Sequence, residues 1–103
     1  MEIKIVSRHF DLAPDMRTFA TTRAEKLLRY FDRIQQIELV IEKVKNNFQT
    51  ECMTDVEHHD LFVSSSEHVD LRTCIDQSLN RTERQLRHYK SRLRDDKHHS
   101  QGR

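Results

Sequence analysis

The stretch "DLRTCIDQSLNRTERQLRHYKSRL", residues 70–93, predicts a long amphipathic helix that packs along a small sheet. Its apolar side chains recur at steps of three and four, so they form one stripe, in which Thr82 fills a gap. Asp70 suits the N-cap, because its carboxylate can accept a hydrogen bond from a free backbone N–H of the first turn. The stripe consists of Leu71, Ile75, Leu79, Leu86, Tyr89 and Leu93.

The segments before this helix predict four strands and one more helix. The first strand alternates around Ile3 and Ile5, and Pro14 suits the first turn of a helix within residues 11–34. The predicted order, β-α-β-β-β-α, is an α+β sandwich in which a four-stranded sheet carries two helices on one face. The apolar residues of the earlier helix are Met16, Phe19, Ala20, Ala24, Leu27 and Phe31. The strands are expected within residues 2–10, 36–45, 48–56 and 61–66.

The hairpin formed by the last two strands has two possible registers. Val56 lies opposite Phe62 in the first and opposite Leu61 in the second, which would turn Leu61 and Val63 inward. Because a one-residue slip reverses the face of every side chain in a strand, the sequence leaves both registers open. In the first register the covered face contains Cys52, Thr54, Ser64 and Ser66.

Glycine is nearly absent from the chain, which contains one Gly and one Pro. This composition excludes the glycine-rich loops that cradle phosphates in nucleotide-binding proteins. It also leaves the hairpin turn "EHHD", residues 57–60, without glycine. We therefore expect His59 or Asp60 to adopt a left-handed backbone conformation.

The bulk composition indicates a small cytoplasmic protein that is not an enzyme. A chain of 103 residues with 35% hydrophobic and 34% charged residues forms one domain, expected at 1–94, with a flexible tail at 95–103. Neither a signal peptide nor an apolar run of membrane-spanning length is present. Cys52 and Cys74 lack metal-binding spacing and are expected to be reduced, half-buried thiols. No catalytic motif, metal site, cofactor or small-molecule substrate is predicted.

Charge is distributed unevenly along the chain, although the formal net charge is only +1. Residues 1–37 contain seven Lys/Arg and five Asp/Glu, and residues 38–70 contain two and eight. Residues 71–103 contain nine and four. An acidic middle and a basic end point to a polyanionic partner that the total charge hides.

The last helix concentrates its positive charge on one side. At 100° per residue, Arg81, Arg84, His88 and Arg92 form a ridge that points away from the apolar stripe. This ridge is roughly 16 Å long, which matches several phosphates of a nucleic-acid backbone. A merely solvated helix face usually mixes signs, but Glu83 is the one acid within residues 80–94. The basic face is broadened by Arg87, Lys90 and Arg94.

The earlier helix is expected to extend this basic surface. Lys26, Arg29 and Arg33 lie away from its apolar set when placed on a helix. Arg23 lies at the edge of the apolar set, where its stem can pack while its guanidinium reaches outward. The acidic strands are expected to lie mostly apart from this surface.

Three stretches resemble one known family. They are "IKIVSRHFDLAPDMR" at 3–17, "KLLRYFDRI" at 26–34 and the helix at 70–93. Together they resemble the bacterial ribosome hibernation-promoting factors, also called the ribosome-associated inhibitor or sigma-54 modulation family. The resemblance covers about residues 1–93.

The resemblance implies a fold like that of double-stranded-RNA-binding domains, and a translation inhibitor of starved or stationary-phase cells. Such a protein binds 16S rRNA of the small ribosomal subunit, in the path of messenger RNA and of the A- and P-site transfer RNAs. Arg8 falls at a polar or basic position of the family. The family's basic RNA-facing positions correspond to Arg23, Lys26, Arg81, Arg84, Arg87, His88 and Lys90. With Arg29 and Arg92 from the helical pattern, these residues form the expected rRNA-binding set.

Departures from the family pattern occur at a few positions. Ser7 and the turn at 57–60 stand where the family often has glycine. His88 stands where the family usually has Lys, which implies a contact that strengthens at acidic pH. The chain ends soon after the last helix, so the resemblance implies a short form that would need a second factor to pair ribosomes.

Two other functions fit parts of the pattern. A general double-stranded-RNA binder would place its basic cluster at the start of the last helix, where this chain has "DLRTC" with a single Arg. A regulator that binds an acidic protein is the other alternative to action on the ribosome.

Overall fold

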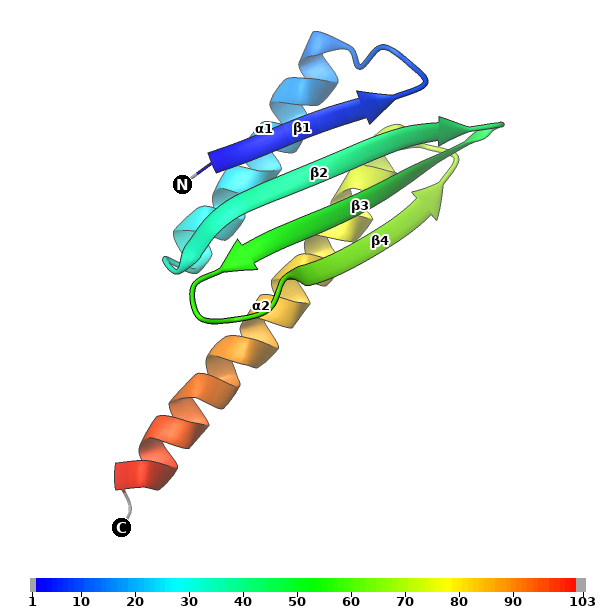
Figure 1. Cartoon of the computed structure of the whole chain (residues 1–103). Helices are drawn as coiled ribbons and strands as arrows, with labels where there is room; N and C mark the ends of the chain where they lie inside the picture. Colours follow the sequence, from blue (N-terminus) through cyan, green and yellow to red (C-terminus); the bar gives the residue numbers. More distant parts are fainter. Residues whose placement is uncertain (1, 102–103) are drawn as a thin grey trace.

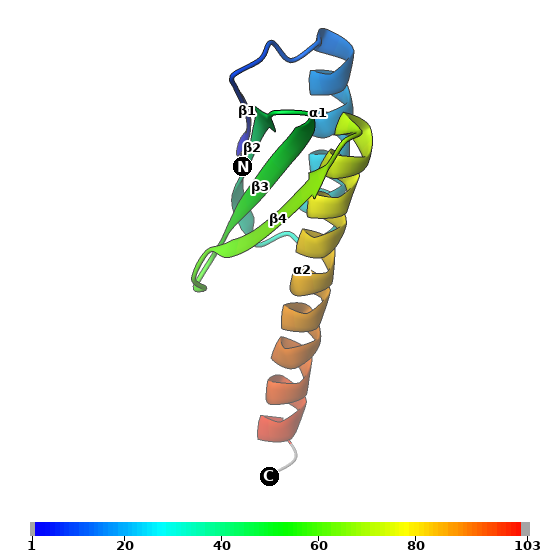
Figure 2. The same ribbon diagram turned by 90° about the vertical axis from the view of Figure 1, so that its right-hand side faces the viewer.

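The computed structural model describes residues 2–101, with side chains described through Arg94. The elements are β1 (Glu2–Arg8), α1 (Pro14–Tyr30), β2 (Ile34–Val44), β3 (Asn47–Val56), β4 (Phe62–His68) and α2 (Leu71–Gln101). They form a twisted four-stranded sheet with both helices on one face (Figure 1). Seen along the sheet, both helices lie to the same side and the other face is open (Figure 2). The predicted element order and one-sided cover are confirmed.

The sheet has the strand order β1-β2-β3-β4, with β1 and β2 parallel and the other pairs antiparallel. Alternation along each strand sends Ile37, Leu39 and Ile41 of β2 into the core, where all three are fully buried. On α1, Ala20 and Ala24 are also fully buried, so this helix can approach the sheet closely. Within the described residues, no helix is both long enough and apolar enough to cross a membrane.

Helix α2 begins as the sequence predicts. The Asp70 carboxylate accepts hydrogen bonds from the backbone N–H of Thr73, at 2.9 Å, and from its hydroxyl, at 2.7 Å. The side-chain bond from Thr73, and then the backbone bond, lower the pKa of Asp70. The helix continues to Gln101, beyond the predicted end near Leu93, and its last turns project past the sheet (Figure 1). Residues 102–103 of the predicted tail lie outside the described residues, and the flexibility of 95–103 stays a prediction.

The Asp70 cap should make a pH-dependent contribution to stability. Its pKa is lower in the folded chain, so its stabilising effect is present above the ordinary aspartate pKa of about 3.9 and is lost as the pH falls through the folded value. We expect Asp70→Ala to lower the melting temperature at neutral pH, by an amount that shrinks on acidification. Asp11→Ala, in an exposed loop, is the matched control. A deficit that does not change with pH would contradict this role of the carboxylate.

A line of small polar side chains joins α2 to β3 and β4. The Ser66 hydroxyl donates to the carbonyl of Cys74 at 2.7 Å, and Ser64 donates to the carbonyl of Ser78 at 2.8 Å. Thr82 Oγ1 lies 2.8 Å from Ser64 Oγ. All of these side chains are buried. Their small size lets the helix backbone approach the strands, and the bonds satisfy hydroxyls that would otherwise be costly to bury.

The β3–β4 register differs from both registers considered in the sequence. Thr54 lies opposite Phe62 and Cys52 opposite Ser64, so the first predicted register is shifted by two residues. The shift keeps the predicted set of Cys52, Thr54, Ser64 and Ser66 on the covered face. The second register is wrong in its facing as well, because Leu61 and Val63 are 56% and 48% exposed.

The turn and the cysteines also correct the sequence predictions. His58, with φ of 63°, is the left-handed residue of the turn, in place of His59 or Asp60. Cys52 and Cys74 are free thiols, as expected, but both are completely buried and not half-buried. Burial raises the pKa of Cys52, although hydrogen bonds with Thr82 and Thr54 oppose that rise.

Side chains from the helices contact both edges of the sheet. Arg17 of α1 donates to the carbonyl of Ile5 on the outer strand β1, at 2.9 Å. On the opposite edge, Gln85 of α2 donates to the carbonyl of Val63 at 2.9 Å, and Arg81 donates to that of Ser65. Carbonyl groups that no neighbouring strand can reach are thus satisfied by helix side chains.

Candidate nucleic-acid interface

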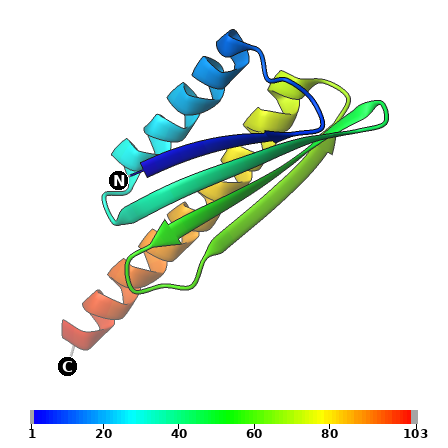
Figure 3. The ribbon, with the colours of Figure 1, turned by 45° about the horizontal axis from the view of Figure 1, so that its top comes forward.

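The helices α1 and α2 lie next to each other across the covered face (Figure 3). Arg23 and Arg72 stabilise the contact region between the two helices, which is called the seam below. Arg23 Nε lies 2.6 Å from Asp76 Oδ1, and its Nη2 donates to Asn80 Oδ1 at 2.7 Å. Arg72 stacks over the Phe19 ring, with its guanidinium carbon 4.4 Å from the ring centroid.

Arg23 therefore lies in a different environment from the one expected. Its side chain is 20% exposed, and its guanidinium contacts α2 and does not reach outward. This geometry favours a role in holding the two helices together. The sequence interpretation had not included Arg72, although it lies at the same angle of the helix as Lys90, five full turns earlier.

Three members of the expected set form an exposed ridge on α2. Arg84, His88 and Arg92 are exposed, and they make no hydrogen bond or ion pair with any residue whose side chain is described. Their spacing along one side of the helix allows them to meet successive anionic groups. Two more members contact the domain itself. Arg81 donates to the Ser65 carbonyl at the sheet edge, and Arg87 pairs with Glu83 one turn earlier.

The Arg87–Glu83 pair does not withdraw Arg87 from the surface. The two side chains are 61% and 37% exposed, and a solvent-exposed pair of this kind contributes little to stability. Its guanidinium can therefore exchange Glu83 for a phosphate, which it binds in the same forked geometry. Arg87 consequently extends the ridge toward α1.

The seam side of α2 carries a second group of cations. The Lys90 ammonium lies 4.6 Å from the centroid of the Tyr30 ring and 3.4 Å from the Tyr30 carbonyl. Arg33, in the turn before β2, and Arg94 of α2 line a groove of about 410 Å³ together with Lys90. On α1, Lys26 and Arg29 are exposed. Lys90, Arg33 and Arg94 thus form a cationic group where the end of α1 meets α2.

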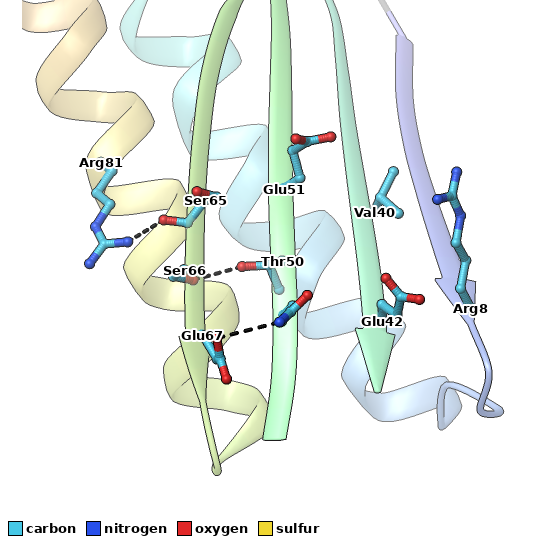
Figure 4. Close-up of a pocket in the computed structure, with 10 residues that line it drawn as sticks. Arg8, Val40, Glu42, Thr50, Glu51, Ser65, Ser66, Glu67 and Arg81 are labelled. Carbon is cyan, nitrogen blue, oxygen red and sulfur yellow. Dashed lines mark hydrogen bonds between the residues drawn. The ribbon is translucent and has the colours of Figure 1, made fainter. Parts of the chain in front are cut away.

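Arg8 lies on the opposite face of the sheet from the helices, and of the other expected residues only Arg81 lines the same groove within the described part of the chain. Arg8 is on β1, on the open face of the sheet, where its register partner is Glu42. Both line a shallow groove of about 440 Å³ that also contains Glu51 and Glu67 (Figure 4). Sequence position placed Arg8 with the basic set, but strand alternation sends it away from the helices.

The open face of the sheet is acidic. Alternation and strand register place two cations, Lys4 and Arg8, on this face. By contrast, α2 up to Arg94 contains seven Lys/Arg and two Asp/Glu, and both acids pair with arginines. Opposite charges therefore occupy opposite faces of the domain, as the sequence predicts. The carboxylates of the open face are Glu2, Glu38, Glu42, Glu51, Asp55 and Glu67.

The protein is therefore of the α+β sandwich class, with both helices on one face of the sheet. Its helical face is cationic and its open sheet face is acidic. The family model described as "Sigma 54 modulation protein / S30EA ribosomal protein" matches residues 3–94. The chain belongs to this family, which confirms the resemblance found in the sequence.

Several known proteins are similar to this chain. The "Ribosome hibernation promoting factor" of Klebsiella oxytoca is 29% identical over 100 residues, which cover 91% of this chain and 98% of the relative. The protein of the same name from Escherichia coli (strain K12) is 28% identical over 94 residues, with the same coverage.

Two solved structures share the fold. A ribosomal subunit interface protein from Coxiella burnetii has a TM-score of 0.81 and 19% identity, and the match covers 88% of this chain and 99% of that one. The N-terminal domain of Thermus thermophilus Protein Y has a TM-score of 0.76 and 23% identity, with 86% and 99% covered. At these identities the likeness establishes the fold alone.

Proposed function

We propose that this chain is a ribosome hibernation factor that inhibits translation by binding the small ribosomal subunit. The observation that carries the proposal is the charge segregation between the helices and the open sheet face. Family membership and the names of the similar proteins support the ribosome as the partner. The expected site is the channel of messenger RNA and of the A- and P-site transfer RNAs.

The mechanism is steric occlusion and needs no catalytic step. Arg84, His88 and Arg92 contact phosphates of 16S rRNA. Arg87 and the cations of the groove beside α2, which are Lys90, Arg33 and Arg94, contact an adjacent stretch of the RNA. The acidic open face is repelled by phosphate, so the domain binds with its helices toward the rRNA.

The position of the cations favours rRNA over a free RNA duplex. A duplex-binding domain needs its basic cluster at the start of the last helix. Here the one arginine at that start, Arg72, is stacked on Phe19 of α1. An excess of RNA duplex should therefore displace the protein from the subunit less effectively than unlabelled subunits do.

Salt dependence tests the electrostatic mechanism. With about six phosphate contacts, the logarithm of the association constant for purified small subunits should fall linearly with the logarithm of salt concentration, with a slope of about −4 to −5. Sedimentation of a labelled protein with subunits at increasing salt measures this slope. A messenger RNA that occupies the channel should compete with the protein. Salt-insensitive binding, or binding without competition, would contradict the proposed site.

A further inference from the structure

The β3–β4 turn builds an aromatic stack against α2. The His59 ring lies parallel to the Phe62 ring, with centroids 4.2 Å apart and an interplanar angle of 4°. Tyr89 of α2 meets His59 edge-on at 4.5 Å and lies 5.5 Å from Phe62. Tyr89 in turn contacts Phe31 of the core at 5.9 Å. An exposed turn residue is thus connected to the interior through three rings.

The turn geometry orients the His59 ring. The left-handed conformation of His58 reverses the chain, and the backbone N–H of His59 donates to the Val56 carbonyl at 3.1 Å. Nδ1 of His59 lies 2.6 Å from the carbonyl oxygen of Asp60. Because a carbonyl can only accept, this nitrogen carries the proton, and Nε2 is left to interact with a ligand.

One face of the His59 ring is covered and the other is open. Phe62 covers the first face. If Tyr89 covered the second face of the His59 ring, the imidazole would lie between Tyr89 and Phe62. The centroids of the Tyr89 and Phe62 rings would then be much farther apart than the observed 5.5 Å. The three distances instead place Tyr89 beside the imidazole, roughly at a right angle to the direction of Phe62. His59 is an exposed residue, and neither aromatic neighbour lies over the second face of its ring.

This open aromatic face lies beside the cationic ridge. Tyr89, which touches His59, is the neighbour of His88 on α2 and lies about one helical turn from Arg92. Arg81 and Gln85 of α2 hydrogen-bond to carbonyl groups of β4. The side of the helix that carries these two residues therefore faces the β3–β4 hairpin. A stacking surface and a row of cations are therefore adjacent on one rigid framework.

We propose that His59 is a stacking platform for one unpaired RNA base, whose flanking phosphates lie on the ridge of α2. Proteins that bind single-stranded RNA combine an aromatic ring for the base with cations for the backbone. The base extends the existing stack of Phe62 and His59. The inference rests on the proposed function, because it adds a contact with an unpaired base to the same rRNA-binding surface.

The test compares identical substitutions at adjacent residues. We expect His59→Asn to weaken binding to purified small subunits about tenfold, since one base stack accounts for roughly a 5- to 100-fold change. His58→Asn is the control. His58 is 84% exposed by side chain, pairs with Glu57 and is absent from the stack, and Asn tolerates its left-handed backbone. His59→Phe should retain binding within about twofold, because it keeps the ring.

Salt dependence separates stacking from charge. Stacking releases no counterions, so His59→Asn should reduce affinity without changing the salt slope, whereas Arg84→Glu should reduce both. A normal affinity for His59→Asn, with binding lost in Arg84→Glu, would overturn the platform and leave the proposed function standing. Loss of affinity that His59→Phe does not restore would also overturn it. Failure of the wild-type protein to bind subunits would reject both proposals.

Discussion

The double substitution Arg84→Glu/Arg92→Glu is expected to weaken binding to the small subunit by about 100-fold or more. Each exposed guanidinium that contacts a phosphate forms a charge-assisted hydrogen bond, whose loss costs about 1.5–3 kcal/mol, and each glutamate adds repulsion. Both positions lie on the exposed ridge, so the fold should be retained. Sedimentation with purified subunits at constant salt measures the change, and circular dichroism verifies the fold.

The control for this prediction carries the same change in charge at another place. Lys4 is on the open sheet face and Lys45 is in the β2–β3 turn, and both are exposed. Lys4→Glu/Lys45→Glu should change affinity by less than about threefold, because its charges lie away from the helices. Equal losses in the two double variants would show that net charge, and not the ridge, determines binding.

Leu86→Ala is expected to have the largest effect on stability, lowering the free energy of unfolding by about 2–5 kcal/mol. Leu86 is fully buried where α2 crosses the sheet, so truncation loses apolar burial and leaves a cavity. Denaturant unfolding followed by circular dichroism measures the loss.

Leu61→Ala provides the matched comparison for the core. It removes the same atoms from a side chain that is 56% exposed, so we expect a change within about 0.5 kcal/mol. Similar losses in the two variants would mean that Leu86 does not support α2 in the way the structure indicates.

Periodic patterns in the sequence predicted most of the fold. The apolar stripe of α2, its Asp70 cap and the alternation of the strands are local properties, each repeated several times along the chain. The β3–β4 register is different, because it depends on contacts with a helix that follows later. Ser64 and Ser66 must reach the carbonyls of Ser78 and Cys74, and an apolar pattern carries no such information.

The sequence predicted those parts of the candidate interface in which the angular position of a residue around the helix axis determines where its side chain points. Arg84, His88 and Arg92 are exposed together because they share one side of α2. Arg23 is engaged by Asp76 on the other helix, which required knowledge of how the helices pack. His59 was overlooked because its stack joins a turn to a helix thirty residues later. The small residues Cys74, Ser78 and Thr82, four apart, were a visible sign of close helix–strand contact.

The contacts of Arg17, Gln85 and Arg81 with the outer strands have a consequence for the behaviour of the protein at high concentration. An outer strand with vacant carbonyls can recruit a strand from another molecule, which is a common route to aggregation. Here a strand that adds to either edge would first have to displace the helix donors at that edge, and it would then lie beside one guanidinium charge, Arg17 at β1 or Arg81 at β4. These contacts would thereby keep the chains as separate molecules when the protein is concentrated.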